Sequence, residues 1–330
     1  MALSLKGVIF SGRTSAGMMS LNSYIATPAA TPGAFGDSFE GGFYTGLIWN
    51  QLVQSTTSTL IATGTQVFTV ANMVVTPIVY AGQALEVRSR ANPSNKMIGV
   101  VTGAVGTALT LNVTSVGGSG TFSDWSIMSQ YRVIVSPKAS GEATALQVKN
   151  ATTASPVECT TLTEGRMSTL AMVADGNATV YPAAHFCNNL SIAGKTDWYL
   201  PARDELELCW RNLKPTADNN YVSSSRQIGE DYNNLGSYTD ISQDNGVNRN
   251  SSPTGAAYTT GNPAQVGAGI NFRTGESEAF IYGSDSYWSS TAWSTDSSWR
   301  HLYFSALPGL QGANDKTNTF DVRAVRRSII

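Results

Sequence analysis

Few residues of this chain have the types and spacing that covalent or metal chemistry requires. The cysteines Cys159, Cys187 and Cys209 form no CxxC pair, and the histidines His185 and His301 form no HExxH motif. Reactive thiols need a base or a partner cysteine, and zinc needs clustered ligands. Cys187 and Cys209 fall on apolar helical stripes, where small buried hydrophobes are expected. Only Cys159 stays open as a reactive thiol, and His185 is expected at a boundary position.

Two acidic pairs are the other candidates, because paired carboxylates can cleave a glycosidic bond. Asp204 and Glu205 begin a predicted helix, where acidic side chains offset the unpaired N–H groups of the first turn. Glu276 and Glu278 lie in a polar segment, where we expect them to be solvated. We therefore predict no catalytic residues and expect that the protein is not an enzyme.

Composition and charge narrow the classes of partner. Charged residues make up 13% of the 330 residues and the formal net charge is −2, with both signs mixed along the chain. Nucleic-acid binding is therefore disfavoured, because it needs a basic surface. The N-terminus fails the length tests for a signal peptide and for a transmembrane helix, so we expect no membrane insertion. No cofactor is expected, although scattered Asp and Asn side chains leave a calcium site possible.

The elements divide the chain into four parts. Residues 1–40 predict an arm that packs on a neighbouring chain, because the sequence from Ser11 to Phe39 is small, polar and punctuated by Pro28, Pro32 and glycines. Residues 41–54 read as a strand, and residues 55–128 as a small antiparallel barrel or sandwich built from short alternating runs at 66–70, 77–80, 84–88, 98–101 and 109–113. We expect the strand at 43–49 to pair with the one from Tyr131. The β module of 55–128 is then an insertion into a domain that resumes at 129–330.

The last part predicts two helices followed by strands. Pro182 begins the first helix, with an apolar face of Ala183, Phe186, Cys187 and Leu190; the second buries Leu206, Cys209, Trp210 and Leu213 and ends at Pro215. Residues 222–278 are expected to be an ordered excursion over the surface. Strands are predicted at 279–282, 287–291, 301–304 and 320–326. The fold class expected from this order is α+β.

Four motifs in this last part carry a resemblance: DWYLPARDEL at 197–206, YWSST at 287–291, GLQ at 309–311 followed by Lys316, and VRAVRR at 322–327. Over residues 131–328 the chain resembles the C-type-lectin-like family that includes phage major tropism determinants, variable proteins of diversity-generating retroelements and adhesin-like bacterial domains. The resemblance implies two helices against a small mixed sheet with adjacent N- and C-terminal strands. It also implies that Arg203, Arg323 and Arg326 anchor the scaffold through carbonyls or carboxylates such as Asp204. Arg327 is left open.

In this family the ligand contacts lie between the YWSST motif and the closing strand, which here is the window 292–320. A mixture of aromatic and adaptable polar side chains suits a binding face. The ligand-binding residues that the resemblance implies are Trp293, Asp296, Arg300, His301, Tyr303, Leu307, Leu310, Gln311, Asn314, Thr317 and Asn318.

The function expected from this resemblance is that of a bacteriophage tail-tip or fibre protein that binds a host-surface receptor, either protein or glycan. Its expected location is the virion, assembled in the host cytoplasm, in contact with other tail proteins and as a homotrimer. The alternatives are a structural tail component without receptor contact, an enzyme related to the formylglycine-generating enzymes, and a polysaccharide-cleaving enzyme. The first rival predicts a window covered by another virion protein, and the enzymes predict a cleft with a thiol or converging acids.

Overall fold

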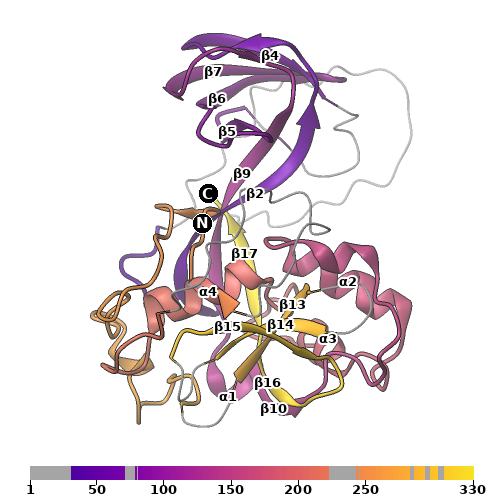
Figure 1. The fold of residues 1–330 in the computed structure, drawn as a ribbon, viewed down its shortest axis with the longest axis vertical. Coiled ribbons are helices and arrows are strands. Elements are labelled where there is room, and N and C mark those ends of the chain that lie inside the picture. Colours follow the sequence, from indigo (N-terminus) through magenta and orange to yellow (C-terminus); the bar gives the residue numbers. More distant parts are fainter. Residues whose placement is uncertain are drawn as a thin grey trace, which may run out of the picture.

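Two long antiparallel strands run through both lobes of the molecule, as Figure 1 shows. The computed structural model describes residues 31–70, 79, 81–222, 243–244, 246–282, 286–293, 298–303 and 308–330, with the backbone alone at 243–244, 298–303 and 329. Strand β2 (Gly42–Ser55) pairs with β9 (Trp125–Val135), and the register joins Phe43 to Val135 and Trp49 to Gln130. The predicted pairing of these two segments is confirmed, and all of residues 56–124 lie between them in the chain.

The upper lobe of Figure 1 is the inserted β module. Its sheet continues from β9 through β5 (Ala84–Ser89), β6 (Lys96–Val105) and β7 (Ala108–Gly117) to β4 (Gly64–Thr69), and β3 (Thr59–Leu60) pairs with β8 (Thr121–Phe122). A bridge between Ser55 and Val70 brings the last strand back to β2, so the sheet curls on itself. The predicted runs at 66–70, 84–88, 98–101 and 109–113 are confirmed as strands, whereas the run at 77–80 lies outside the described residues except for Val79.

Alternation explains why these segments form strands. In β7, Leu109, Leu111 and Val113 are buried while the intervening Thr110 and Asn112 are not. Successive side chains of a strand point to opposite faces, so one face of β7 supplies the module's core and the other faces outward. Trp125 and Ile127 of β9 complete that core.

The lower lobe, the head, holds a second sheet of mixed direction. Its order is β10 (Glu142–Leu146), β16 (Phe320–Arg323), β13 (Ser286–Ala292), β14 (Ser298–Tyr303), β15 (Gln311–Asp315) and β11 (Gln243–Asp244), with β13 and β16 parallel. The last strand, β17 (Val325–Ile329), pairs with β9, and β12 (Ser251–Ser252) and β1 (Ser38–Phe39) pair with β2. Strands of mostly antiparallel sheets together with separate helices confirm the α+β class.

The helices pack on the strands in two groups, and each group contributes to a separate hydrophobic core. Helix α4 (Arg203–Leu213) packs against β2, β9 and β17 through Leu206, Cys209, Trp210 and Leu213. Helix α3 (Pro182–Asn188) packs with α2 (Gly165–Asp175) around Trp198 and Trp288. Both predicted helices are confirmed. Helix α2 and the single turn α1 (Lys138–Gly141) are not predicted from the sequence.

Three predicted segments differ from the structure. Residues 279–282 are not a strand, because Ala279 and Phe280 are buried in a loop. The predicted strand at 320–326 is two strands, β16 and β17, separated at Ala324, which lets one segment join both sheets. Residues 31–39 were assigned to the arm, but Phe39 lies in the head's core and the amide of Gly36 donates to the carbonyl of Tyr44.

Candidate functional site

The predicted ligand window lies on three neighbouring strands of the head. Trp293 directly follows β13, whereas Arg300, His301 and Tyr303 belong to β14. The register of β14 with β15 places Arg300 opposite Ala313 and His301 opposite Gly312. The structure thus brings most of the predicted residues into one sheet region, while Asp296 and Leu307 lie outside the described residues.

The described side chains of this window divide into exposed and buried groups. Asn318 is exposed, and Trp293, Asn314 and Thr317 are half-buried. Leu310 and Gln311 are only 4% exposed. Gln311 is turned toward α4, where its Oε1 accepts a hydrogen bond from Arg203 Nε at 2.5 Å. The prediction that Leu310 and Gln311 contact ligand is therefore corrected: in this structure they belong to the support beneath the face.

Strand β13, which carries the YWSST motif, is buried along its whole length. Thr291 Oγ1 donates to the carbonyl of Thr161 at 2.8 Å and accepts from the amide of Arg203 at 2.9 Å. Trp288 Nε1 donates to the carbonyl of Leu146 at 2.9 Å. The motif therefore ties the window's first strand to α4 and to β10 rather than offering side chains to solvent.

Three carboxylates on α4 are fully buried, and each accepts hydrogen bonds from other parts of the chain. Asp204 accepts from Arg203 Nη1 and from Asn250 Nδ2, both at 2.8 Å. Glu205 Oε2 accepts from the amide of Ala202 at 2.8 Å, which caps the first turn as the sequence predicted. Burial of a carboxylate is costly unless it is paired in this way.

Glu205 and Glu207 also bind residues from outside α4. Glu205 Oε1 accepts from Tyr199 Oη at 2.6 Å and from Arg327 Nε at 2.7 Å. Glu207 accepts from Asn248 Nδ2 at 2.6 Å and from Tyr258 Oη at 2.8 Å. The excursion is consequently not confined to the surface, since part of it is anchored in the core beside α4.

The arginines of the closing motif are structural. Arg323 Nη2 pairs with Glu278 Oε2 at 2.6 Å, and Arg326 pairs with Asp197 at 2.8 Å and with Glu40 at 2.6 Å. The expectation that Arg203, Arg323 and Arg326 anchor the scaffold is confirmed. The solvated role expected for Glu278 is corrected, because this side chain neutralises a fully buried arginine; Glu276 is exposed.

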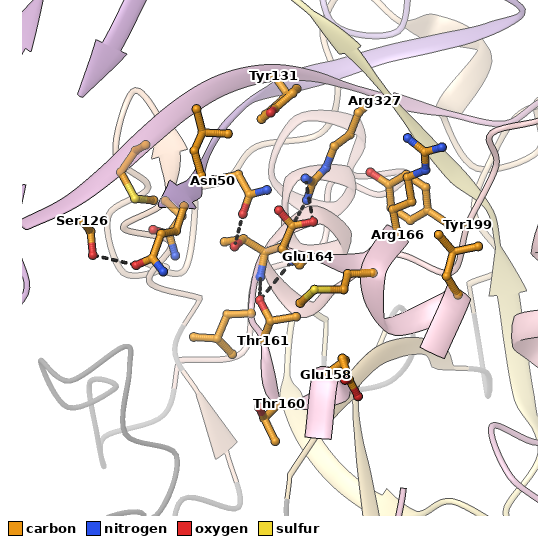
Figure 2. Close-up of a pocket in the computed structure, with 18 of the residues that line it drawn as sticks. Asn50, Ser126, Tyr131, Glu158, Thr160, Thr161, Glu164, Arg166, Tyr199 and Arg327 are labelled. Atoms are coloured by element: carbon orange, nitrogen blue, oxygen red, sulfur yellow. Dashed lines mark hydrogen bonds and ion pairs between the residues drawn. The ribbon is translucent and has the colours of Figure 1, made fainter. Parts of the chain in front are cut away.

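A cleft of about 1480 Å³ separates the module from α2, and Figure 2 looks into it. Asn50, Ser126 and Tyr131 come from the strands on one side, while the segment before α2 faces them with Thr160 and Thr161. Sequence reasoning missed this cleft, because its walls come from segments that are separate in the chain, among them residues 50–52, 126–131 and 157–171.

The polar groups at the floor of the cleft are largely paired with one another. Thr163 Oγ1 donates to Asn50 Oδ1 at 2.8 Å. Arg327, left open by the sequence, pairs with Glu164 at 3.2 Å and also donates to the carbonyl of Thr163. Burial raises the pKa of Glu164, although the charge of Arg327 opposes this shift. The floor of the cleft joins the two lobes. Because its polar groups bind one another, fewer of them can bind a ligand than the size of the cleft suggests.

The thiols and histidine occupy interior or boundary positions. All three cysteines are free and buried. Burial raises the pKa of the Cys159 thiol to about 12, and burial also raises the pKa values of Cys187 and Cys209. His185 is half-buried, with Nε2 2.7 Å from the carbonyl of Gly176, as expected of a boundary residue.

The described residues include neither a metal-binding group nor a membrane-spanning helix. No group of three or more His, Cys, Asp or Glu side chains within the described ranges is arranged to hold a metal ion. Among the same residues, no helix is long and apolar enough to cross a membrane. Comparison with known proteins found no matching family model, no matching curated protein and no matching solved structure.

The buried thiols give a direct test of cysteine chemistry. At pH 8 a thiol with a pKa of about 12 is almost entirely protonated and should not react with a disulfide reagent such as DTNB. We predict no labelling of the native protein and labelling of all three cysteines after unfolding in guanidinium chloride. Native labelling of Cys159 at the rate of free cysteine would support the thiol-enzyme alternative.

Arg327 and Arg166 form a matched pair of cleft arginines. Arg327→Met leaves Glu205 and Glu164 without their shared cation, so we predict a loss of about 3–5 kcal/mol in the free energy of unfolding, measured in urea. Arg166 is exposed, and Arg166→Met should change this free energy by less than about 0.5 kcal/mol. Equal effects of the two substitutions would contradict a structural role for Arg327.

Proposed function

We propose that this chain is a receptor-binding protein of a tailed bacteriophage and that it displays its ligand face on a C-type-lectin-like head. The observation that carries the proposal is that the head has a buried scaffold and a separate, partly exposed window. The residues of the four motifs are mainly buried scaffold, whereas the window between them holds the exposed and half-exposed side chains of β15 and its turn.

The scaffold side of this division is extensive. Trp198, Tyr199 and Leu200 of the first motif, Tyr287 and Trp288 of the second, and Val322 and Val325 of the last are each at most 2% exposed. Their packing surrounds β13, whereas the neighbouring part of the sheet includes half-buried and exposed side chains on β15, where residues of many types can be accommodated. A fixed support beneath a replaceable face is the property that a diversified binding protein needs.

The window side has the composition of a binding face. Trp293 supplies a large, rigid aromatic surface, while Asn314, Thr317 and Asn318 supply adaptable hydrogen-bonding groups. Host receptors are repeated over a cell surface, so a homotrimer of such heads would gain strength from multivalency. In this proposal the arm and the β module attach the head to other tail proteins and join the three copies.

The window rather than the cleft is the proposed ligand site, because the cleft floor is internally paired. The window also separates this function from a purely structural tail component, since a covered patch could not contact a cell. Receptor contact requires that the same residues be free in the assembled virion.

Two aromatic substitutions test the proposal. Trp293→Ala and Tyr303→Ala remove contact area from the window, and each should reduce adsorption of the fluorescently labelled protein to a bacterial strain that binds it by roughly ten-fold or more. Phe35→Ala, which removes an exposed aromatic outside the window, is the control and should adsorb normally. Circular dichroism should report the same fold for all three. Normal adsorption by both window variants would overturn the proposed site.

A further inference from the structure

A continuous chain of side-chain hydrogen bonds, the first partly buried and the other three buried, connects the β module to the ligand window. Arg88 Nη2, on β5 of the module, donates to Asn250 Oδ1 at 2.6 Å. Asn250 Nδ2 donates to Asp204 Oδ2 at 2.8 Å, and Asp204 Oδ1 accepts from Arg203 Nη1 at 2.8 Å. Arg203 Nε then donates to Gln311 Oε1 at 2.5 Å, at the start of β15. Four contacts therefore link a strand of one lobe to the face of the other.

We infer that Arg88 and Asn250 are positioning residues for the ligand face, so that the β module is part of the binding apparatus and not only an attachment device. The inference rests on the proposed function of the window. Each contact positions the next side chain. The guanidinium of Arg88 holds the amide of Asn250, and that amide holds the carboxylate of Asp204. Asp204 in turn orients Arg203 toward Gln311. Gln311 pairs with Leu302 in β14, so its position sets the register of the window's two strands.

Burial makes this chain stiff. Asn250, Arg203 and Gln311 are each 4% exposed and Asp204 is fully buried. Within such an interior a polar group that loses its partner pays its full desolvation cost, so alternative arrangements are disfavoured. Asn250 is held a second time, because its carbonyl accepts from the amide of Trp49 on β2 at 2.6 Å. Strand β2, which runs through both lobes, and strand β5 of the module thus both contact the head at this residue.

Removal of Arg88 loses one ion pair within the module but leaves the shorter ion pair of Glu86 in place. Glu86 lies 3.7 Å from Arg88 Nη1 but keeps Lys96 at 2.9 Å. Arg90 is the matched control, because it also lines the cleft. The side chain of Arg90 donates to Gln54 Oε1 on β2 at 2.8 Å and to the carbonyl of Asp124, just before β9, at 3.2 Å.

The first experiment measures adsorption of Arg88→Met, Gln311→Met and the double variant to cells that bind the wild-type chain. Each single substitution should weaken binding by roughly three- to thirty-fold. The double variant should bind no worse than the weaker single variant, because both cut one chain. Losses that multiply in the double variant, or an equal loss in Arg90→Met, would overturn the inference.

The second experiment needs no ligand and so separates this inference from the proposed function. Hydrogen exchange of the free protein should become faster in the amides of β15 (Gln311–Asp315) for Arg88→Met, and remain unchanged for Arg90→Met. Unchanged exchange in β15 would overturn the coupling even if the window binds cells. Faster exchange combined with no adsorption by the wild-type chain would retain the coupling and refute the proposed function instead.

Discussion

The head depends on the three buried carboxylates of α4. Burial of Asp204, Glu205 and Glu207 is costly unless each carboxylate is bound, and together they bind two distant segments of the chain. Glu205 holds the C-terminal strand through Arg327, while Asp204 and Glu207 hold the excursion through Asn250 and Asn248. Because helix, terminal strand and excursion meet at one element, the arrangement of the whole lobe follows from the pairing of these acids.

If the window is the ligand face that we propose, the same constraint lets the head keep its fold when residues of that face are substituted. The scaffold contacts run beneath β13 and β15, through Thr291 and Gln311, and end at the strands that carry the window. Among the described side chains of β15, the half-buried Asn314 and the exposed Asp315 lie outside this network. Substitutions there leave the buried pairs intact, so a rigid support and a variable surface can coexist in a single sheet.

Much of the fold could be predicted from the sequence where a local pattern of apolar residues was compatible with only one type of secondary structure. The stripe of Leu206, Cys209, Trp210 and Leu213 identified α4, and alternation at 109–113 identified β7. Helix α2 could not be found in this way, because Met167 and Leu170 are exposed while Met172 is buried, so its apolar residues follow no single face. The break at Ala324 could not be predicted from the sequence either, because it depends on tertiary structure: β16 and β17 join different sheets.

The site was only partly predictable for a related reason. The anchoring roles of Arg203, Arg323 and Arg326 followed from the motifs, but the partner Glu278 lies in a loop that no periodicity connects to them. Gln311 is a polar side chain of the kind expected in a binding face, but it is 4% exposed and accepts a hydrogen bond from Arg203 Nε. Long-range pairing of this kind is set by topology, which short patterns do not encode.

The most direct test of the ligand face is hydroxyl-radical footprinting of the chain with and without cells that bind it. Trp293 in the window and Met167, which is 44% exposed beside the cleft, are reactive probes of the two candidate surfaces. The account predicts that binding protects Trp293 and the peptide containing Tyr303 while Met167 is oxidised as before. Protection of Met167 with unchanged oxidation of Trp293 would contradict it and would place the ligand in the cleft.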